Sequence, residues 1–235
     1  MIIWAGTSNK DVGMVIEHYP SIVFPERDQT IQEVPGRNGN VVITNGSFKN
    51  YEQQYSAFLD SQAIGGLEQV MPKVMDWLLG HEGYQRLEDS YFPDFYRMAY
   101  YSGGSVFMNM FNDYGQGTLT FNCAPEKYYK SGEWQMTLSK GQVLLNPSSF
   151  AAFPLITVTG SGSGTLTFNS SSITISSIGT SVTIDVKQHR AYNGTTNRNN
   201  TITGSYENLK LGKETTITWS GGVTGVKIVP RWWTI

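Results

Sequence analysis

Residues 155–168 read Leu-Ile-Thr-Val-Thr-Gly-Ser-Gly-Ser-Gly-Thr-Leu-Thr-Phe. Apolar and polar side chains alternate in both arms of this stretch, at Ile156 and Val158 and again at Leu166 and Phe168. Alternation with a period of two places the apolar side chains on one face of a β-strand. The Gly-Ser repeat between the arms has the composition of a flexible hairpin. The stretch therefore predicts two strands joined by a turn.

The same alternation recurs through the rest of the C-terminal part. The apolar positions are Ile173 and Ile175, then Val182, Ile184 and Val186, then Ile217 and Trp219, then Val226 and Ile228. Gly-rich breaks separate these runs, and residues 145–235 contain 16 Thr, 12 Ser and 10 Gly. Thr favours strands, whereas Gly and Ser favour tight turns. Short alternating strands at this spacing predict a β-sandwich.

The N-terminal part predicts strands and one helix, an α+β arrangement. A turn is expected at Val34–Gly39, and the expected strands are Ile2–Trp4, Val41–Ile43, Val106–Met110 and Thr118–Phe121. The helix is indicated by apolar residues spaced i, i+3, i+4 and i+7, namely Met71, Val74, Met75 and Leu78. Pro72 suits the first turn of that helix, and Gly80 suits its end.

A domain boundary is predicted near residue 145, where Asn146-Pro147 favours a turn. Residues 1–144 hold 10 Lys+Arg and 16 Asp+Glu, a net charge of −6. Residues 145–235 hold 7 Lys+Arg and 3 Asp+Glu, a net charge of +4. Together with the change in residue types, this predicts two domains, 1–144 and 145–235.

Composition excludes several protein classes. The 235 residues carry a net charge of −2, which does not fit a generally basic nucleic-acid binder. The single cysteine, Cys123, excludes an intrachain disulfide framework and a zinc site built from clustered cysteines. Apolar runs are only a few residues long, so we expect neither a signal peptide nor a membrane span.

Catalytic chemistry has little support in the sequence. The three histidines lie far apart, and Cys123 sits in a strand pattern that predicts a small buried side chain. Glu88, Asp89 and Asp94 could be considered for glycoside hydrolysis, but a solvated acidic loop explains them better. We therefore predict no catalytic, cofactor-binding or metal-binding residues.

Aromatic residues are concentrated between residues 84 and 101, where seven of them are mixed with Arg and Asp. Aromatic side chains and Arg are enriched in the cores of protein interfaces. The closing Arg-Trp-Trp has the same character, although a buried last strand would explain it equally well. The candidate interface residues are Tyr84, Arg86, Tyr91, Phe92, Phe95, Tyr96, Arg97, Trp232 and Trp233.

Several short motifs, taken in order, resemble the distal tail proteins of long non-contractile-tailed phages (siphophages) of Gram-positive bacteria. In the first part they are Ser8–Gly13, Val34–Gly39, Trp77–Leu79 leading into Gly83–Asp89, and Phe121–Pro125. In the second part they are Asn146–Phe150, Gly160–Leu166, Gly194–Asn200 and Pro230–Thr234. Each motif is weak alone, but their order along the whole chain is specific.

The resemblance implies a structural protein and not an enzyme. It implies a tail-tube-like N-terminal domain that forms a homohexameric ring, and a galectin-like or carbohydrate-module-like C-terminal β-sandwich. The implied partners are the tail tube protein, a tail-associated adhesion or lysin protein and, in some relatives, receptor-binding proteins. Such a ring is a baseplate hub at the tail tip of the virion, assembled in the host cytoplasm, and DNA passes through it without specific binding. The excess acid of residues 1–144 then predicts a channel lined by acidic or neutral groups.

Two alternative functions follow from the residues. A carbohydrate-binding module, or a lectin-like adhesin for the host surface, would use Trp219, Trp232 and Trp233 to stack on sugars. Exposed rings beside convergent polar groups would support it, but Trp219 alternates in phase with Ile217 and is expected to be buried. A cell-wall hydrolase would need an acid/base pair, and the sequence offers none that is credible.

Overall fold

The structure is a computed structural model that describes residues 1–60, 67–105, 107–110 and 114–235. The chain divides into two compact units, one formed by residues 1–127 with Ile235 and the other by residues 128–234. Each unit has its own cluster of buried apolar side chains. Strands dominate both units, and α1 is the one α-helix within the described ranges.

The first unit is built on an antiparallel sheet with the strand order β2-β1-β7-β8-β10-β6-β3, and β9 pairs with β10. Its elements are β1 (Ile2–Trp4), β2 (Thr7–Ser8), β3 (Met14–Ile16), β4 (Arg27–Gln32), β5 (Val41–Phe48), β6 (Tyr51–Asp60), α1 (Leu67–Leu79), β7 (Gln85–Asp89), β8 (Phe95–Tyr101), β9 (Phe107–Met110) and β10 (Tyr114–Tyr129).

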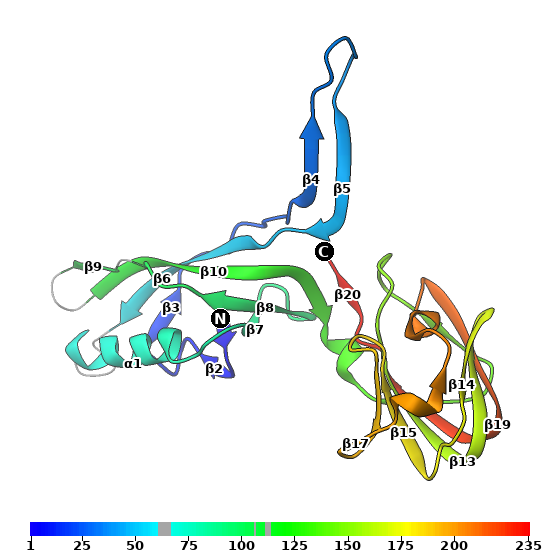
Figure 1. Ribbon diagram of the computed structural model, residues 1–235. Coiled ribbons are helices and arrows are strands. Elements are labelled where there is room, and N and C mark those ends of the chain that lie inside the picture. Colours follow the sequence, from blue (N-terminus) through cyan, green and yellow to red (C-terminus); the bar gives the residue numbers. More distant parts are fainter. Residues whose placement is uncertain (61–66, 106, 111–113) are drawn as a thin grey trace. The chain divides into compact units, whose positions relative to one another are not determined.

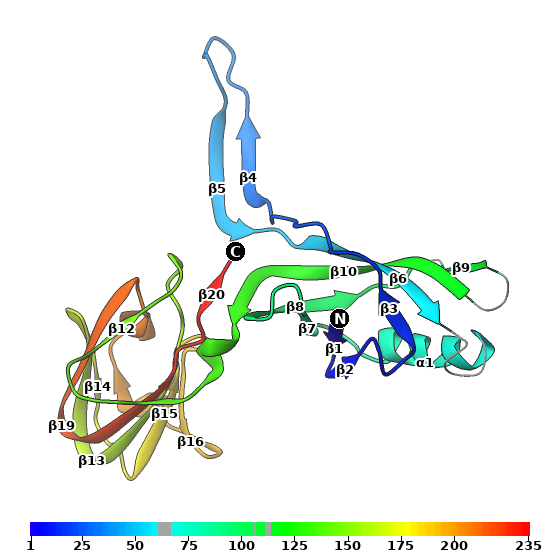
Figure 2. The ribbon, with the colours of Figure 1, turned by 180° about the vertical axis from the view of Figure 1, so that it is seen from behind.

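Helix α1 covers one face of this sheet, as both views show (Figures 1 and 2). Its buried side chains join Trp4 and Phe121 of the sheet in one apolar core. The indole N–H of Trp77 donates to the carbonyl oxygens of Trp4 (3.3 Å) and Thr7 (3.2 Å). The helix is therefore attached to the β1–β2 end of the chain by hydrogen bonds as well as by burial.

The predicted helix is confirmed, but its buried face differs from the prediction. Met75 is 52% exposed, whereas Trp77, which the spacing left out, is buried. Pro72 lies inside the helix and not in its first turn, because the helix begins earlier than predicted. The helix ends before Gly80, whose amide donates to the carbonyl oxygen of Asp76 at 2.9 Å. A Cβ at Gly80 would lie 2.4 Å from that oxygen, so the close approach requires glycine.

The strands predicted for the first unit are largely confirmed. Ile2–Trp4 is β1, Val41–Ile43 opens β5, and Thr118–Phe121 lies within β10. Of the predicted strand Val106–Met110, residues 107–110 form β9 and Val106 lies outside the described residues. The turn Val34–Gly39 connects β4 to β5.

Strands β4 and β5 form a separate two-stranded sheet, and within the described residues they pair only with each other (Figure 1). Nearly all their side chains are exposed. This hairpin therefore takes no part in the core of the first unit.

The second unit contains ten strands and three short 3-10 helices among its described residues. The helices are Lys130–Glu133, Asn199–Thr201 and Tyr206–Leu209. The strands are β11 (Met136–Leu138), β12 (Gln142–Leu145), β13 (Leu155–Phe168), β14 (Ser171–Ile175), β15 (Ser181–Asp185), β16 (Arg190–Asn193), β17 (Thr196–Asn197), β18 (Ile202–Thr203), β19 (Glu214–Val229) and β20 (Trp233–Thr234).

Two long strands, β13 and β19, run side by side in the second unit (Figure 2). One half of this pair belongs to the layer that contains β15, and the other half belongs to the layer that contains β14. Residues 155–159 of β13 pair with β15, and residues 164–168 pair with β14. Ile156 from the first half and Leu166 from the second half are both fully buried in the same core. The sheet thus folds over its own apolar face. The chain is mainly β with one short helix, as the sequence predicts.

The Gly160–Gly164 repeat is not a hairpin, so that prediction was wrong. It lies inside β13, at the point where the register between β13 and β19 shifts. A Cβ at Gly160 would lie 2.0 Å from the carbonyl oxygen of Gly222, and a Cβ at Gly222 would lie 1.6 Å from that of Ser161. The two backbones therefore approach so closely at this bend that only glycine fits on either strand.

The two compact units meet in sequence at Lys127 and Tyr128, earlier than the predicted boundary at residue 145. The physical reason is strand pairing. Strands β11 and β12, which precede residue 146, both pair with β19 near the end of the chain. Pairing with a distant strand assigns these residues to the second unit, and local composition does not reveal it.

Candidate functional site

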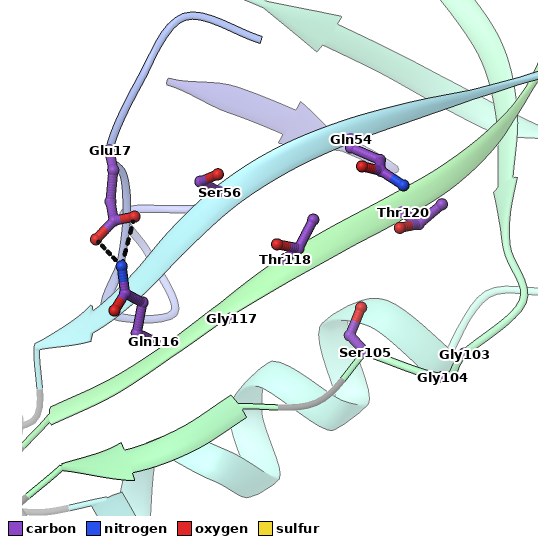
Figure 3. Close-up of a pocket in the computed structure, with 10 residues that line it drawn as sticks. All are labelled: Glu17, Gln54, Ser56, Gly103, Gly104, Ser105, Gln116, Gly117, Thr118 and Thr120. Carbon is purple, nitrogen blue, oxygen red and sulfur yellow. Dashed lines mark hydrogen bonds between the residues drawn. The ribbon is translucent and has the colours of Figure 1, made fainter. Parts of the chain in front are cut away.

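A polar groove of about 600 Å³ runs along β6 and β10 in the first unit (Figure 3). Buried Tyr55 and Ala57 alternate along β6 with Gln54 and Ser56, which line the groove. The groove therefore lies on the face of the sheet opposite to the apolar core. Cross-strand pairing places Ser56 opposite Thr118.

The lining of the groove consists of hydroxyl groups, amides and glycine backbone. Among the described residues that line it, Glu17 is the one charged side chain. The side-chain amide of Gln116 donates to both carboxylate oxygens of Glu17, at 3.1 and 3.2 Å (Figure 3). Apart from Glu17, the described lining residues therefore present neutral hydrogen-bonding groups, and none of them carries a positive charge.

Part of the predicted interface segment does gather at the surface. Tyr84 is 46% exposed, and its ring meets Tyr100 edge-on with the ring centroids 5.4 Å apart. The Arg86 guanidinium lies 3.8 Å from the centre of the Tyr96 ring and forms an ion pair with Glu88. Each of these side chains therefore already has a partner within its own chain.

The aromatic residues between β7 and β8 are half-buried. Tyr91 packs against Tyr19 with the ring centroids 4.5 Å apart, and Phe92 lies 5.5 Å below the Arg97 guanidinium. Phe95, at the start of β8, is also half-buried. They remain candidates for an interface, with less free area than the sequence implied.

Arg97 lies in the interior, which corrects its assignment as an interface residue. It is 4% exposed and donates to the carboxylate of Asp89 at 2.7 Å. The Tyr55 hydroxyl donates to the same carboxylate oxygen at 3.0 Å. Asp89 is itself 5% exposed, so describing it as part of a solvated acidic loop was also wrong. The three side chains form a buried polar network among β6, β7 and β8.

Burial dominates the protonation of the groups around this network. It raises the pKa of Tyr51 to about 12 and that of the Cys123 thiol to about 12. Burial alone would lower the pKa of Arg97, but Tyr55, Tyr51 and Asp89 offset this, and the net direction is upward. Cys123 is fully buried as predicted, and a thiol with so high a pKa is a poor nucleophile.

The tryptophans of the second unit form no exposed platform for sugars. Trp232 is 6% exposed and belongs to the apolar core, so it is not a surface interface residue in this chain. Trp219 is buried, as its alternation predicts. Trp233 is half-buried, packs on Phe150 at 4.7 Å and donates its indole N–H to the Ala151 carbonyl. The observation that would have supported a lectin is therefore missing from these three residues.

In the described part of the chain, no group of three or more His, Cys, Asp or Glu side chains could hold a metal ion. No helix there is long and apolar enough to cross a membrane.

The exposed apolar residues of β4 and β5, namely Ile31, Val42 and Ile43, were not singled out from the sequence. Three consecutive apolar residues, Val41 to Ile43, were the available signal, because consecutive strand residues point to opposite faces.

The two units together have the fold of phage distal tail proteins. One similar solved structure is the Dit protein of phage SPP1, described as a paradigm of the hub adsorption apparatus in phages that infect Gram-positive bacteria. It aligns with a TM-score of 0.78 over 100% of this chain and 98% of that chain, at 14% sequence identity. At this identity the likeness establishes the fold.

Two further structures, both of the phage P2 baseplate in its activated conformation, match less well. The one with Ca has a TM-score of 0.49, 10% identity and coverage of 92% of this chain and 89% of that chain. The one with Sr has a TM-score of 0.45, 12% identity and coverage of 92% and 90%. No protein-family model matches the chain, and no curated protein matches it.

Proposed function

We propose that this protein is a structural component of a phage tail tip, a hub between the tail tube and the baseplate or adhesion apparatus. The observation that carries the proposal is the match to SPP1 Dit over 100% of this chain and 98% of that chain. A match confined to one unit would support only a shared domain. Fold alone does not define function, so the proposal also draws on the surfaces of the first unit.

The hub is proposed to be a homohexameric ring made by the first unit, with the second unit as its galectin-like domain. Closed cyclic rings need two different contact surfaces on each copy. The first unit offers more than one such surface, namely the exposed hairpin β4–β5 and the aromatic side chains around Tyr84. The proposed partners are the tail tube protein, a tail-associated adhesion or lysin protein and receptor-binding proteins, in the assembled virion.

Passage of DNA through the ring is supported by the polar groove on β6 and β10. We propose that this face lines the channel. A lysine or arginine on the wall would bind phosphate groups, release counterions and retain the duplex. Hydroxyls, amides and the carboxylate of Glu17 offer no such attraction, so a duplex could move past them. The role needs no catalytic group.

Native mass spectrometry and electron microscopy of the purified chain test the proposal. A hexamer would have a mass of about 157 kDa, six times the 26.2 kDa of one chain, and would show a central opening. Gold-labelled antibody against the protein should mark the tail tip of intact virions. Labelling of the capsid or of the tube wall, or absence of the protein from virions, would contradict the proposal.

A further inference from the structure

Strand β12 is an open edge of the second unit. Within this unit, whose residues 128–234 are all described, β12 pairs with β19 on one side and with no strand on the other. An edge strand presents unpaired N–H and C=O groups, on which a strand of another chain can pair. The register of β12 shows which of its residues carry these groups.

Hydrogen-bonded and non-hydrogen-bonded residues alternate along an antiparallel ladder such as that of β12 and β19. The backbone amide of Asn146, the residue after β12, donates to the carbonyl oxygen of Lys213 at 3.0 Å. Asn146 therefore belongs to a hydrogen-bonded pair, and by alternation Val143 and Leu145 do not. These two residues direct their N–H and C=O groups away from β19, toward the open edge.

The hydrogen bonds of β19 agree with this register. Thr216 lies opposite Val143. Its N–H donates to the side-chain oxygen of Asn169 at 2.8 Å, and its C=O accepts from the backbone amide of Asn169 at 2.9 Å. The backbone of Thr216 is thus used on the side of β19 away from β12, as expected for a non-hydrogen-bonded pair.

The exposed side chains of β12 are apolar. Val143 is 44% exposed and Leu145 is 71% exposed, whereas Leu144 between them is buried in the apolar core. Alternate residues of a strand share a face, so Val143 and Leu145 form an apolar strip on the outer face of the layer that contains β14. The same two residues therefore carry both the open backbone groups and the exposed apolar side chains.

The sequence of this edge lacks the usual protection. Exposed edge strands commonly carry charged residues or proline, which prevent pairing with other chains. Residues 141–145 read Gly-Gln-Val-Leu-Leu and contain neither. An unprotected edge beside exposed apolar side chains is typical of a surface that a partner covers.

We propose that β12 is a docking edge for an extended segment of a different protein, which adds one strand to the layer that contains β14. Only another polypeptide strand satisfies a row of backbone donors and acceptors, while alternate side chains of that strand provide specificity. Val143 and Leu145 favour a segment with apolar residues at alternate positions. The inference uses the fold of the second unit and does not depend on the proposed hub.

Charge indicates that the segment is acidic and is not a second copy of β12. Residues 128–234 carry 9 Lys+Arg and 4 Asp+Glu, a net charge of +5. Lys140 and Lys213 are exposed near the two ends of β12, and Glu214 offsets one of them. Two copies that met edge to edge would bring these basic units together, whereas acidic residues on an incoming segment would be attracted to them.

Substitutions in the full-length chain separate backbone pairing from apolar contact. Val143→Pro removes an outward N–H, and proline is tolerated on an edge strand where that N–H faces solvent. Leu145→Thr keeps the backbone and a residue that favours strands, but removes the apolar side chain. Leu145→Val is the matched control, because it keeps both. Thermal unfolding confirms that each variant is folded.

The probe is a capped peptide of alternating Val and Thr with one Glu at each end. Its binding should slow the solvent exchange of the Val143 and Leu145 amide hydrogens, measured by NMR. We expect Val143→Pro and Leu145→Thr each to weaken binding at least about fivefold, because a hydrogen bond or an apolar contact is lost. Leu145→Val should bind like the natural chain.

Two further peptides are controls for the chemistry of the partner. The same peptide methylated on every backbone nitrogen cannot donate to the C=O groups of β12 and should not bind. A peptide with Lys in place of Glu should bind more weakly, because the edge is basic. Equal binding of the methylated peptide would overturn the strand pairing, and equal binding of the Lys peptide would overturn the acidic partner.

The remaining outcomes also decide the proposal. It would be overturned if the acidic peptide did not bind, or if it bound without protecting the Val143 and Leu145 amides. Sedimentation equilibrium tests the second-copy alternative. Self-association of the natural chain that Val143→Pro abolished would assign the edge to a second copy and overturn the proposed occupant. A chain that forms no ring but binds the acidic peptide at β12 would remove the proposed hub and leave this docking edge intact.

Discussion

The carboxylate of Asp89 accepts a 2.7 Å hydrogen bond from the guanidinium of Arg97, and both side chains are almost fully buried. The second carboxylate oxygen of Asp89 accepts from the backbone amides of Tyr91 (3.0 Å) and Phe92 (2.8 Å). One buried carboxylate thus joins β7 to β8 and also fixes the turn between them. The aromatic segment depends on this ion pair for its shape.

Removal of one partner should be costly. Arg97→Met leaves the Asp89 carboxylate buried without its cation, and breaking a buried ion pair in this way costs about 3–5 kcal/mol. Denaturant unfolding of the first unit should show that loss. Arg86→Met is the control, since the Arg86 side chain is 36% exposed and its pair with Glu88 should contribute at most about 1 kcal/mol. Equal effects of the two substitutions would contradict the prediction.

Acid should weaken the second unit through Asp185. Burial alone would raise the pKa of this carboxyl. The Arg231 guanidinium, at 2.8 and 3.0 Å, and the Gln188 amide lower it by more, so the pKa of Asp185 lies below its ordinary value of 3.8. A lowered pKa in the folded state stabilises the protein above the unfolded-state pKa, and this contribution is lost as the pH falls through the folded-state pKa.

Asp185→Asn should therefore destabilise the second unit by about 1–3 kcal/mol at neutral pH. The stability of the variant should change less than that of the natural chain as the pH drops below 4, the region of the ordinary carboxyl pKa. Calorimetric unfolding at a series of pH values measures both effects. Parallel pH profiles for the two proteins would refute the assignment.

Gly222→Ala should strain the bend of β13 and β19. The new Cβ would lie 1.6 Å from the Ser161 carbonyl oxygen, so both backbones must move, at a cost of about 1–3 kcal/mol or more. Gly212→Ala is the matched control, because nothing lies within 4 Å of its Cβ position. The thermal midpoint of the second unit should fall for the first variant and hold for the second. Similar midpoints would mean that the strands separate easily at this point.

Lysine substitutions in the groove on β6 and β10 should make this surface bind duplex DNA. Gln54→Lys with Thr118→Lys should give the assembled protein affinity for duplex DNA, with a log–log salt slope of about −0.9 for each phosphate contacted. The same number of lysines at Met75 and Leu79, exposed positions of α1, is the control. Filter binding at several salt concentrations distinguishes them. Salt-sensitive DNA binding by the natural chain, or equal DNA binding by the control variant, would contradict the proposal that the groove lines the channel.

Much of the fold follows from local patterns. Alternation located the core strands of the second unit, because residues two apart on a strand share a face whatever lies opposite. The i, i+3, i+4 and i+7 spacing predicted helix α1 in the same way, but it did not predict correctly which side chains of the helix are buried. Trp77 turns inward to reach the carbonyl oxygens of Trp4 and Thr7, and that contact spans about seventy residues of sequence.

Features set by distant partners could not be predicted. A Gly-Ser repeat fits a hairpin and a bend equally well, since both need glycine; the opposing Gly222 decides between them. Likewise, a carboxylate such as Asp89 carries no local sign that Arg97 will bury it. The aromatic segment was therefore predicted to form an interface in part, with core packing explaining the rest, and Val41–Ile43 was predicted only as a strand after a turn.

The sharing of β13 and β19 between two layers has a consequence for synthesis on the ribosome. When residues 128–213 have emerged, β14 and β15 can pair with β13, but the other edge of β13 stays open along its length until β19 is made. Strand β19, residues 214–229, then pairs with both halves of β13 and so completes both layers. Folding of the second unit must wait for these late, long-range pairings, which are slow to form. A nascent chain interrupted before residue 214 would therefore lose both layers and not one, and would present open strand edges to its neighbours.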